Sequence, residues 1–154
     1  MPGNQVLVGG LFLTDGYQTT ISFSGGGFDL GVIFLEKEVQ PPALNGGGGI
    51  EVTTMRNQVV RTKAHKNLYQ LDDLTLQVSY APESYEAIAG IININGLWTV
   101  NFPDGSLLSF FAWLDTFTPA ALKEGEFPLA EIKVIVSNIN ENGIESVYTF
   151  ESAT

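Results

Sequence analysis

The stretch LWTVNFPDGSLLSFFAWL, residues 97–114, decides the fold of this chain. Its centre, Pro103-Asp104-Gly105, predicts a tight turn, because proline presets φ and glycine supplies the left-handed conformation. Strands are predicted on both sides of the turn, at residues 97–102 and 106–114, so the stretch forms a hairpin. The second strand is apolar on both faces. Only one face can join the core, so the other needs a cover from a helix or from another subunit.

Further strands and one helix are predicted around this hairpin. Residues 73–80 alternate between apolar and polar side chains, as a half-buried strand does. Pro82 suits the first turn of a helix that ends at Asn95-Gly96, and one face of that helix would carry Tyr85, Ile88, Ala89 and Ile92. The other predicted strands span residues 19–23, 31–39, 50–55, 129–137 and 144–151. A turn is expected at Gly25-Gly26-Gly27.

The elements sum to a single domain over residues 1–154, large enough to bury a core. The predicted class is mainly β: a β-sandwich or barrel of about seven to eight strands with one flanking α-helix. A long extended segment, about residues 40–70, is predicted to leave this domain as a flexible arm. Pro41-Pro42 end the preceding strand, and the glycines at 46–49 form a flexible joint. They do not predict a phosphate loop, because a strand rather than a helix follows them.

The chain carries a net charge of −10, with its basic residues concentrated in the arm. Strong acidity argues against wrapping a nucleic acid, since phosphate binding needs a basic footprint. The arm contains four of the seven lysines and arginines and the single histidine, His65. The four are Arg56, Arg61, Lys63 and Lys66.

The residue types argue against an enzyme and predict no cofactor and no metal. One histidine and no cysteine exclude three-histidine zinc sites and Cys-His dyads. No GxSxG nucleophile turn accompanies His65. Carboxylate pairs are interpreted as solvated edges or a helix start; they are Asp72 with Asp73, Glu83 with Glu86, and Glu124 with Glu126. No secretory signal is visible at the start, and the longest apolar stretch, residues 107–114, is too short for a bilayer. We therefore expect no membrane insertion.

The order of the elements resembles that of one family of virion proteins. The matching residues are Phe102-Pro103-Asp104-Gly105-Ser106, then residues 110–114, then residues 132–136 followed by Ser137-Asn138. The loop at 122–130 and the strand–helix unit at 75–88 also fit. Over residues 72–150, about half of the chain, this order resembles the major tail proteins, or tail tube proteins, of long non-contractile-tailed bacteriophages of the phage lambda type.

The resemblance implies a structural virion protein. Six subunits would form a ring, strands from all six would join one inter-subunit β-barrel, and stacked hexameric rings would form the tail tube that conducts DNA during ejection. The implied partners are further copies of the chain, the tail tip and tail terminator proteins, and a tape measure protein inside the tube. DNA would pass without specific binding. Assembly would take place in the host cytoplasm, and the final location would be the phage tail.

Two groups of charged residues gain candidate roles in such a tube. The arm would reach the adjacent ring, where Arg56, Arg61, Lys63 and Lys66 would meet acidic surface and fix the register. An acidic lumen would repel phosphates and let DNA slide; the candidate lumen-facing residues are Glu36, Glu38 and Glu51. Two alternatives stay open. One is the tube protein of a contractile tail or secretion machine, and the other is a carbohydrate-binding β-sandwich module that uses aromatic residues such as Trp98 and Trp113.

Overall fold

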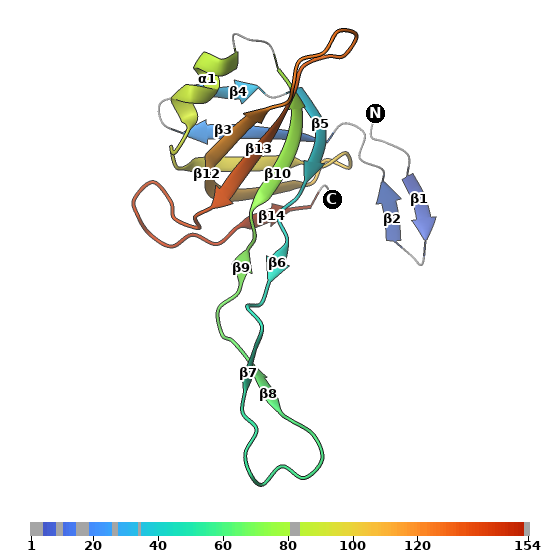
Figure 1. Ribbon diagram of the computed structural model, residues 1–154, viewed down its shortest axis with the longest axis vertical. Helices are drawn as coiled ribbons and strands as arrows, with labels where there is room; N and C mark the ends of the chain where they lie inside the picture. Colours follow the sequence, from blue (N-terminus) through green and yellow to red (C-terminus); the bar gives the residue numbers. More distant parts are fainter. Residues whose placement is uncertain are drawn as a thin grey trace.

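A computed structural model describes residues 5–8, 11–14, 19–25, 28–33, 35–80 and 84–152. It confirms the mainly β class with one helix (Figure 1). The main sheet is antiparallel and runs in the order β4-β3-β11-β12-β13-β10-β5. A short strand, β14, pairs with the first residues of β12. The strands of this sheet are β3 (Thr20–Gly25), β4 (Phe28–Ile33), β5 (Leu35–Gln40), β10 (Leu74–Ser79), β11 (Gly96–Asn101), β12 (Leu107–Pro119), β13 (Leu129–Val136) and β14 (Thr149–Glu151).

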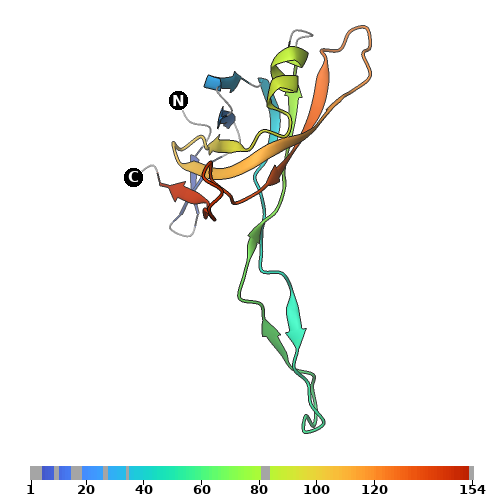
Figure 2. The ribbon, with the colours of Figure 1, turned by 90° about the vertical axis from the view of Figure 1, so that its left-hand side faces the viewer.

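The main sheet curls until strands near its two ends meet, which gives the half-closed barrel seen in Figure 2. β5, at one end, contacts β3, which is second from the other end. At this seam the backbone N–H of Ile21 donates a hydrogen bond to Oε1 of Glu36, with an N···O distance of 3.0 Å. A charged side chain thus links two strands that are not neighbours in the sheet.

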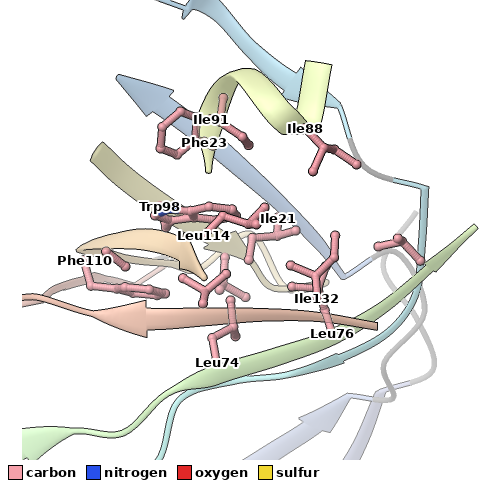
Figure 3. Packing of buried hydrophobic residues seen from close by; sticks show 14 of the residues in the cluster. Ile21, Phe23, Leu74, Leu76, Ile88, Ile91, Trp98, Phe110, Leu114 and Ile132 are labelled. Atoms are coloured by element: carbon pink, nitrogen blue, oxygen red, sulfur yellow. The ribbon is translucent and has the colours of Figure 1, made fainter. Parts of the chain in front are cut away.

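The core lies on one face of the curled sheet, which we call the inner face (Figure 3). In β10 the alternating residues Leu74, Leu76 and Val78 are buried, as the periodicity predicts. Trp98 of β11 is fully buried against Phe23, with ring centroids 5.0 Å apart. The residues with the largest fully buried side chains include Phe110, Leu114, Ile132 and Val134. The residues that alternate with them form the outer face.

The helix α1 (Ser84–Ile91) packs on the inner face and buries only part of the predicted set of residues. Ile88 and Ile91 are buried, whereas Ala89 and Ile92 are exposed. Ile92 leaves the predicted face because α1 ends at Ile91, and Ile92 instead forms a bridge to Leu114. Pro82 and Glu83, predicted to start the helix, lie outside the described residues, as do Gly26 and Gly27 of the predicted turn.

Three predicted strands differ from the observed ones. The run at 31–39 divides into two strands, because β4 pairs with β3 whereas β5 pairs with β10 at the other end of the sheet. The strand expected at 50–55 is limited to β7 (Gly49–Glu51), and the one at 144–151 to β14. The chain also has a hairpin of β1 (Gln5–Val8) and β2 (Leu11–Thr14) that was not predicted; among the described strands these two pair only with each other.

The arm leaves the sheet between β5 and β10 and returns as a two-stranded hairpin (Figure 1). Its root is the pair β6 (Leu44–Asn45) and β9 (Gln70–Leu71). Further out, β7 pairs with β8 (Lys63–His65). The predicted long extended segment therefore carries backbone pairing of its own along part of its length. Its flexibility stays a prediction.

Candidate assembly surfaces

The glycine joint of the arm has a defined turn geometry. Gly47 and Gly48 have φ angles of +84° and +81°, a region that side chains with a Cβ rarely adopt. The N–H of Gly47 donates to Oδ1 of Asn45 at 2.8 Å. The glycines are therefore required by the path of the backbone between the root pair and the outer pair of the arm.

The end of the arm is a loop over residues 52–62, which we call the tip loop. It is organised around Asn57, whose Oδ1 accepts from the N–H of Thr54 at 2.8 Å and whose Nδ2 donates to the carbonyl of Val60 at 3.0 Å. The N–H of Val52 donates to the carbonyl of Thr62 at 3.0 Å and closes the loop. These bonds hold a loop that has no packed core of its own.

The tip loop presents apolar side chains to solvent. Met55, Val59 and Val60 have relative exposures of 102%, 92% and 67%. Single exposed apolar residues are common on protein surfaces, but a group of them on a projecting loop indicates an interaction site. Sequence reasoning identified the arm by its polarity and did not pick out these three residues.

The four basic residues predicted to contact a neighbouring ring all lie on the arm and are exposed. Arg56 and Arg61 belong to the tip loop, Lys63 to β8, and Lys66 follows β8. Arg61 forms an ion pair with Glu51 of the facing strand, with an N···O distance of 3.5 Å. His65 accompanies them in β8 and is also exposed. Their contact with a neighbour stays a prediction.

The three candidate lumen residues occupy three different environments. A β-bulge in β5 places Glu36 opposite buried Val78, whereas Glu38 lies opposite exposed Gln77. Glu36 therefore shares the inner face and the seam, while Glu38 stands on the outer face. Glu51 belongs to β7 in the arm and not to the main sheet. Simple alternation along β5 would have put Glu36 and Glu38 on one face of the sheet, and the bulge places them on opposite faces.

The outer face has two chemically different halves. Along β3 and β11 it carries uncharged hydroxyl and amide side chains, for example Asn101, whose Nδ2 donates to Oγ1 of Thr20 at 3.1 Å. Along β5, β10 and β13 it forms a shallow polar groove with charged residues. The lining includes Glu38, Gln40, Thr75, Gln77 and Glu131.

A second groove lies where the root of the arm meets the segment before β14; we call it the root groove. Its lining includes Leu68, Tyr69, Leu71, Glu145, Val147 and Tyr148. The rings of Tyr69 and Tyr148 meet edge-on, with centroids 6.5 Å apart. Sequence reasoning missed this site because its two sides lie more than 70 positions apart. The only local signal was the pair Leu68-Tyr69 inside a polar arm.

Among the described residues, the carboxylates of the predicted pairs form no common site. Asp72 accepts from Nε2 of Gln70 at 2.8 Å, and Asp73 pairs with Lys133 at 3.7 Å. Glu86, Glu124 and Glu126 are exposed, and Glu83 lies outside the described residues. Over those described residues, no group of three or more His, Cys, Asp or Glu side chains is arranged to hold a metal ion.

The aromatic residues suggested for a sugar-binding face are mostly in the core. Trp98 is fully buried and Trp113 is half-buried. Phe127 and Leu122 are exposed, but they stand on the loop between β12 and β13 and not on a flat strand surface. In the part of the chain that the structure covers, no helix is long and apolar enough to cross a bilayer.

Comparison with known proteins yields matches by structure alone. No protein-family model matches the chain, and no curated protein matches its sequence. A chain from the 6-fold symmetrised baseplate of the anti-feeding prophage (AFP) is similar in structure, with a TM-score of 0.66 and 6% identity over 92% of this chain and 97% of that chain. A chain from the tail of an empty GTA particle with C6 symmetry has a TM-score of 0.61 and 10% identity over 91% and 100% of the two chains. At these identities the likeness shows that this chain shares the fold of subunits from tail and baseplate particles.

Proposed function

We propose that this chain is a structural tail protein that assembles into hexameric rings and that the rings stack into a tube conducting DNA during ejection. The observation that carries the proposal is the fold shared, over nine-tenths of the chain, with subunits of two six-fold symmetric tail-type particles. The resemblance of residues 72–150 to lambda-type tail tube proteins supports the same conclusion from the sequence. The virion tail is the corresponding location.

The distribution of charge supports stacking through the arm. Residues 40–70 contain four basic residues and one acidic residue, a net charge of +3, so the rest of the chain carries −13. Opposite charges attract across an interface, speed encounter and fix register. An arm with its own basic residues would therefore meet an acidic body when it reaches another copy.

The same acidity suits a channel for DNA. A surface that carries negative charge repels phosphates and gains nothing from counterion release. Of the three candidate lumen residues, Glu38 is the best placed, because it stands exposed on the outer face beside Glu131. Glu36 is engaged at the seam and Glu51 on the arm. We propose the outer face of β5, β10 and β13 as the lumen surface.

Joining of strands between subunits would complete the barrel. The main sheet is only half closed, and β4 and β5 are its two terminal strands. Unpaired strand edges are sites where another chain can add, and a closed ring removes them. The half-buried outer residues Leu107, Phe111 and Trp113 of the doubly apolar β12 offer further surface for a neighbour.

Electron microscopy of the purified chain at increasing concentration tests the proposal. We expect rings with six-fold symmetry or hollow tubes, and we expect 1 M salt to weaken stacking, since the screening length falls to about 3 Å. A variant lacking residues 46–66 serves as the control, because it keeps the main sheet and loses the basic arm. Folded wild-type protein that stays monomeric at every concentration would overturn the proposal.

A further inference from the structure

We propose that the tip loop of one copy docks into the root groove of the next copy along the tube. The inference rests on the proposed function and deepens it by naming the surface that receives the arm. The donor is the apolar group Met55, Val59 and Val60 with Arg56 beside it. The acceptor is the groove formed by Leu68, Tyr69, Val147 and Tyr148, with Glu145 in its lining.

The donor side is preorganised. The hydrogen bonds of Asn57 hold the backbone of the loop in place while the three apolar side chains point away from any core. A loop that is already ordered loses less conformational entropy when it binds. Burial of Met55 and Val59, which are almost completely exposed here, would then contribute to the affinity with little ordering cost.

The acceptor side has the size and chemistry for side chains and not for a small molecule. The root groove has a volume of about 110 Å³, well below the roughly 300–1,000 Å³ of typical ligand pockets. Leu68, Tyr69 and Val147 remain 82%, 60% and 59% exposed around it. An apolar rim of this kind is stabilised when a complementary apolar group covers it.

Opposite charges accompany the two apolar groups. Arg56 stands in the tip loop between Met55 and the Asn57 hydrogen bonds, and Glu145 lines the root groove. When the apolar side chains enter the groove, the guanidinium and the carboxylate come within reach of each other. The pair would select the orientation of the loop in the groove.

The length of the arm fits this contact. Residues 41–55 span at most about 50 Å when extended at ~3.3 Å per residue. A neighbour displaced along the arm by no more than this distance therefore has its own root within reach of the tip loop of the first copy.

The loop between β12 and β13 is the competing acceptor. It carries Leu122 and Phe127 with Glu124 and Glu126, and Figure 1 shows it at the end of the molecule opposite the arm. Docking there would place two copies end to end, separated by the length of the arm, and would keep their sheets apart. It also offers a projecting loop and not a groove. The root groove is therefore the better receiver.

The contact is heterologous, because its two surfaces differ and each copy carries one of each. When the symmetry operation that relates neighbouring copies is a translation, such a contact repeats without closing on itself and produces a linear stack. The arm and root groove thus supply the axial growth of the tube, independently of the sheet contacts that close each ring.

Engineered cysteines test the contact cleanly, because the chain contains no cysteine. Val59→Cys and Val147→Cys proteins, the second with a mass tag, are mixed at assembling concentration and treated with a short bis-maleimide. We expect a mixed dimer as the main product. The matched control replaces Val147→Cys with Leu122→Cys, which places the thiol on the opposite loop and should give at least tenfold less mixed dimer.

Exchanging the charges of Arg56 and Glu145 gives a second test of the contact. Arg56→Glu and Glu145→Arg each place like charges together and should weaken association about two- to fivefold, the scale of an exposed ion pair. The double variant should regain the wild-type association constant. Lys123→Glu, on the opposite loop, is the control and should change little.

The outcomes separate the inference from the proposed function. Two results would overturn docking in the root groove and leave the tail-tube proposal standing, provided that tubes form. One is cross-linking of the Val59→Cys protein to the Leu122→Cys protein, and the other is a double charge variant that does not regain association. A folded chain that neither assembles nor yields any mixed dimer overturns both.

Discussion

The seam of the curled sheet depends on Glu36, and its removal should cost measurable stability. Its carboxylate accepts the N–H of Ile21, and Ile21 is only 3% exposed. In Glu36→Ala this N–H loses its acceptor at a partly buried site. Hydrogen bonds to charged groups contribute about 1.5–3 kcal/mol, so we expect a loss near ~2 kcal/mol. For a chain of this size that corresponds to a fall in Tm of about 4–8 °C.

The same strand offers matched controls. Glu38→Ala removes an equal charge two positions away on the exposed outer face, and should change the free energy of unfolding by less than about 0.5 kcal/mol. Glu36→Gln keeps an oxygen acceptor and should lose less than Glu36→Ala. Urea denaturation followed by the intrinsic fluorescence of the two tryptophans, Trp98 and Trp113, measures all three.

The comparison can refute the reasoning directly. Equal losses for Glu36→Ala and Glu38→Ala would show that the hydrogen bond at the seam contributes nothing and that charge alone matters. It would also return Glu36 to the same standing as Glu38 among the candidate lumen residues.

Three further predictions concern the hairpin, the turn and the arm. Gly96→Ala should destabilise the fold by about 1–3 kcal/mol in chemical denaturation, because its Cβ would lie 2.6 Å from Phe23 Cε2; Gly49→Ala, where the nearest atom is 3.4 Å away, should cost less. Hydrogen bonds from Ser106, chiefly from its backbone and then from its side chain, hold the pKa of Asp104 below its ordinary value. The Asp104 carboxylate therefore stabilises the fold at pH values above its unfolded pKa, and this stabilisation is lost as pH falls through its folded pKa. Thermal denaturation across pH should therefore show Asp104→Asn less stable than wild type near pH 7, with the gap closing in acid; a gap that widens in acid would contradict this sign. Removal of residues 46–66 should shift Tm by less than about 2 °C, since these residues are exposed or contact only the arm, while sedimentation shows that assembly is lost.

Local signals allowed much of the fold to be predicted. The Pro103-Asp104-Gly105 turn forms as expected, and the N–H of Phe102 donates to the carbonyl of Ser106 at 2.9 Å across it. Alternation in β10 correctly predicted which of its residues are buried. Such signals act between near neighbours in the chain, so no tertiary information is needed to read them.

The candidate surfaces were only partly predictable. The arm was visible from composition, since it gathers four of the seven basic residues. The placement of Glu36 was not, because it depends on a bulge and on the approach of β3 to β5. The root groove was also invisible, since residues 67–71 and 145–148 meet only when β14 joins β12 and the arm returns to β10.

The sequence by itself determined the mainly β class, the central hairpin, the projecting basic arm and the absence of cysteine chemistry, because each follows from residue type or short-range periodicity. Only the tertiary structure decided that the apolar run at 31–39 divides between two ends of one sheet. It also decided that β3 and β5 meet at a hydrogen bond to the carboxylate of Glu36, and that a groove forms at the root of the arm. The physical reason is that burial and side-chain pairing depend on which distant strands become neighbours, and strand pairing between distant segments leaves no periodic trace in either segment alone.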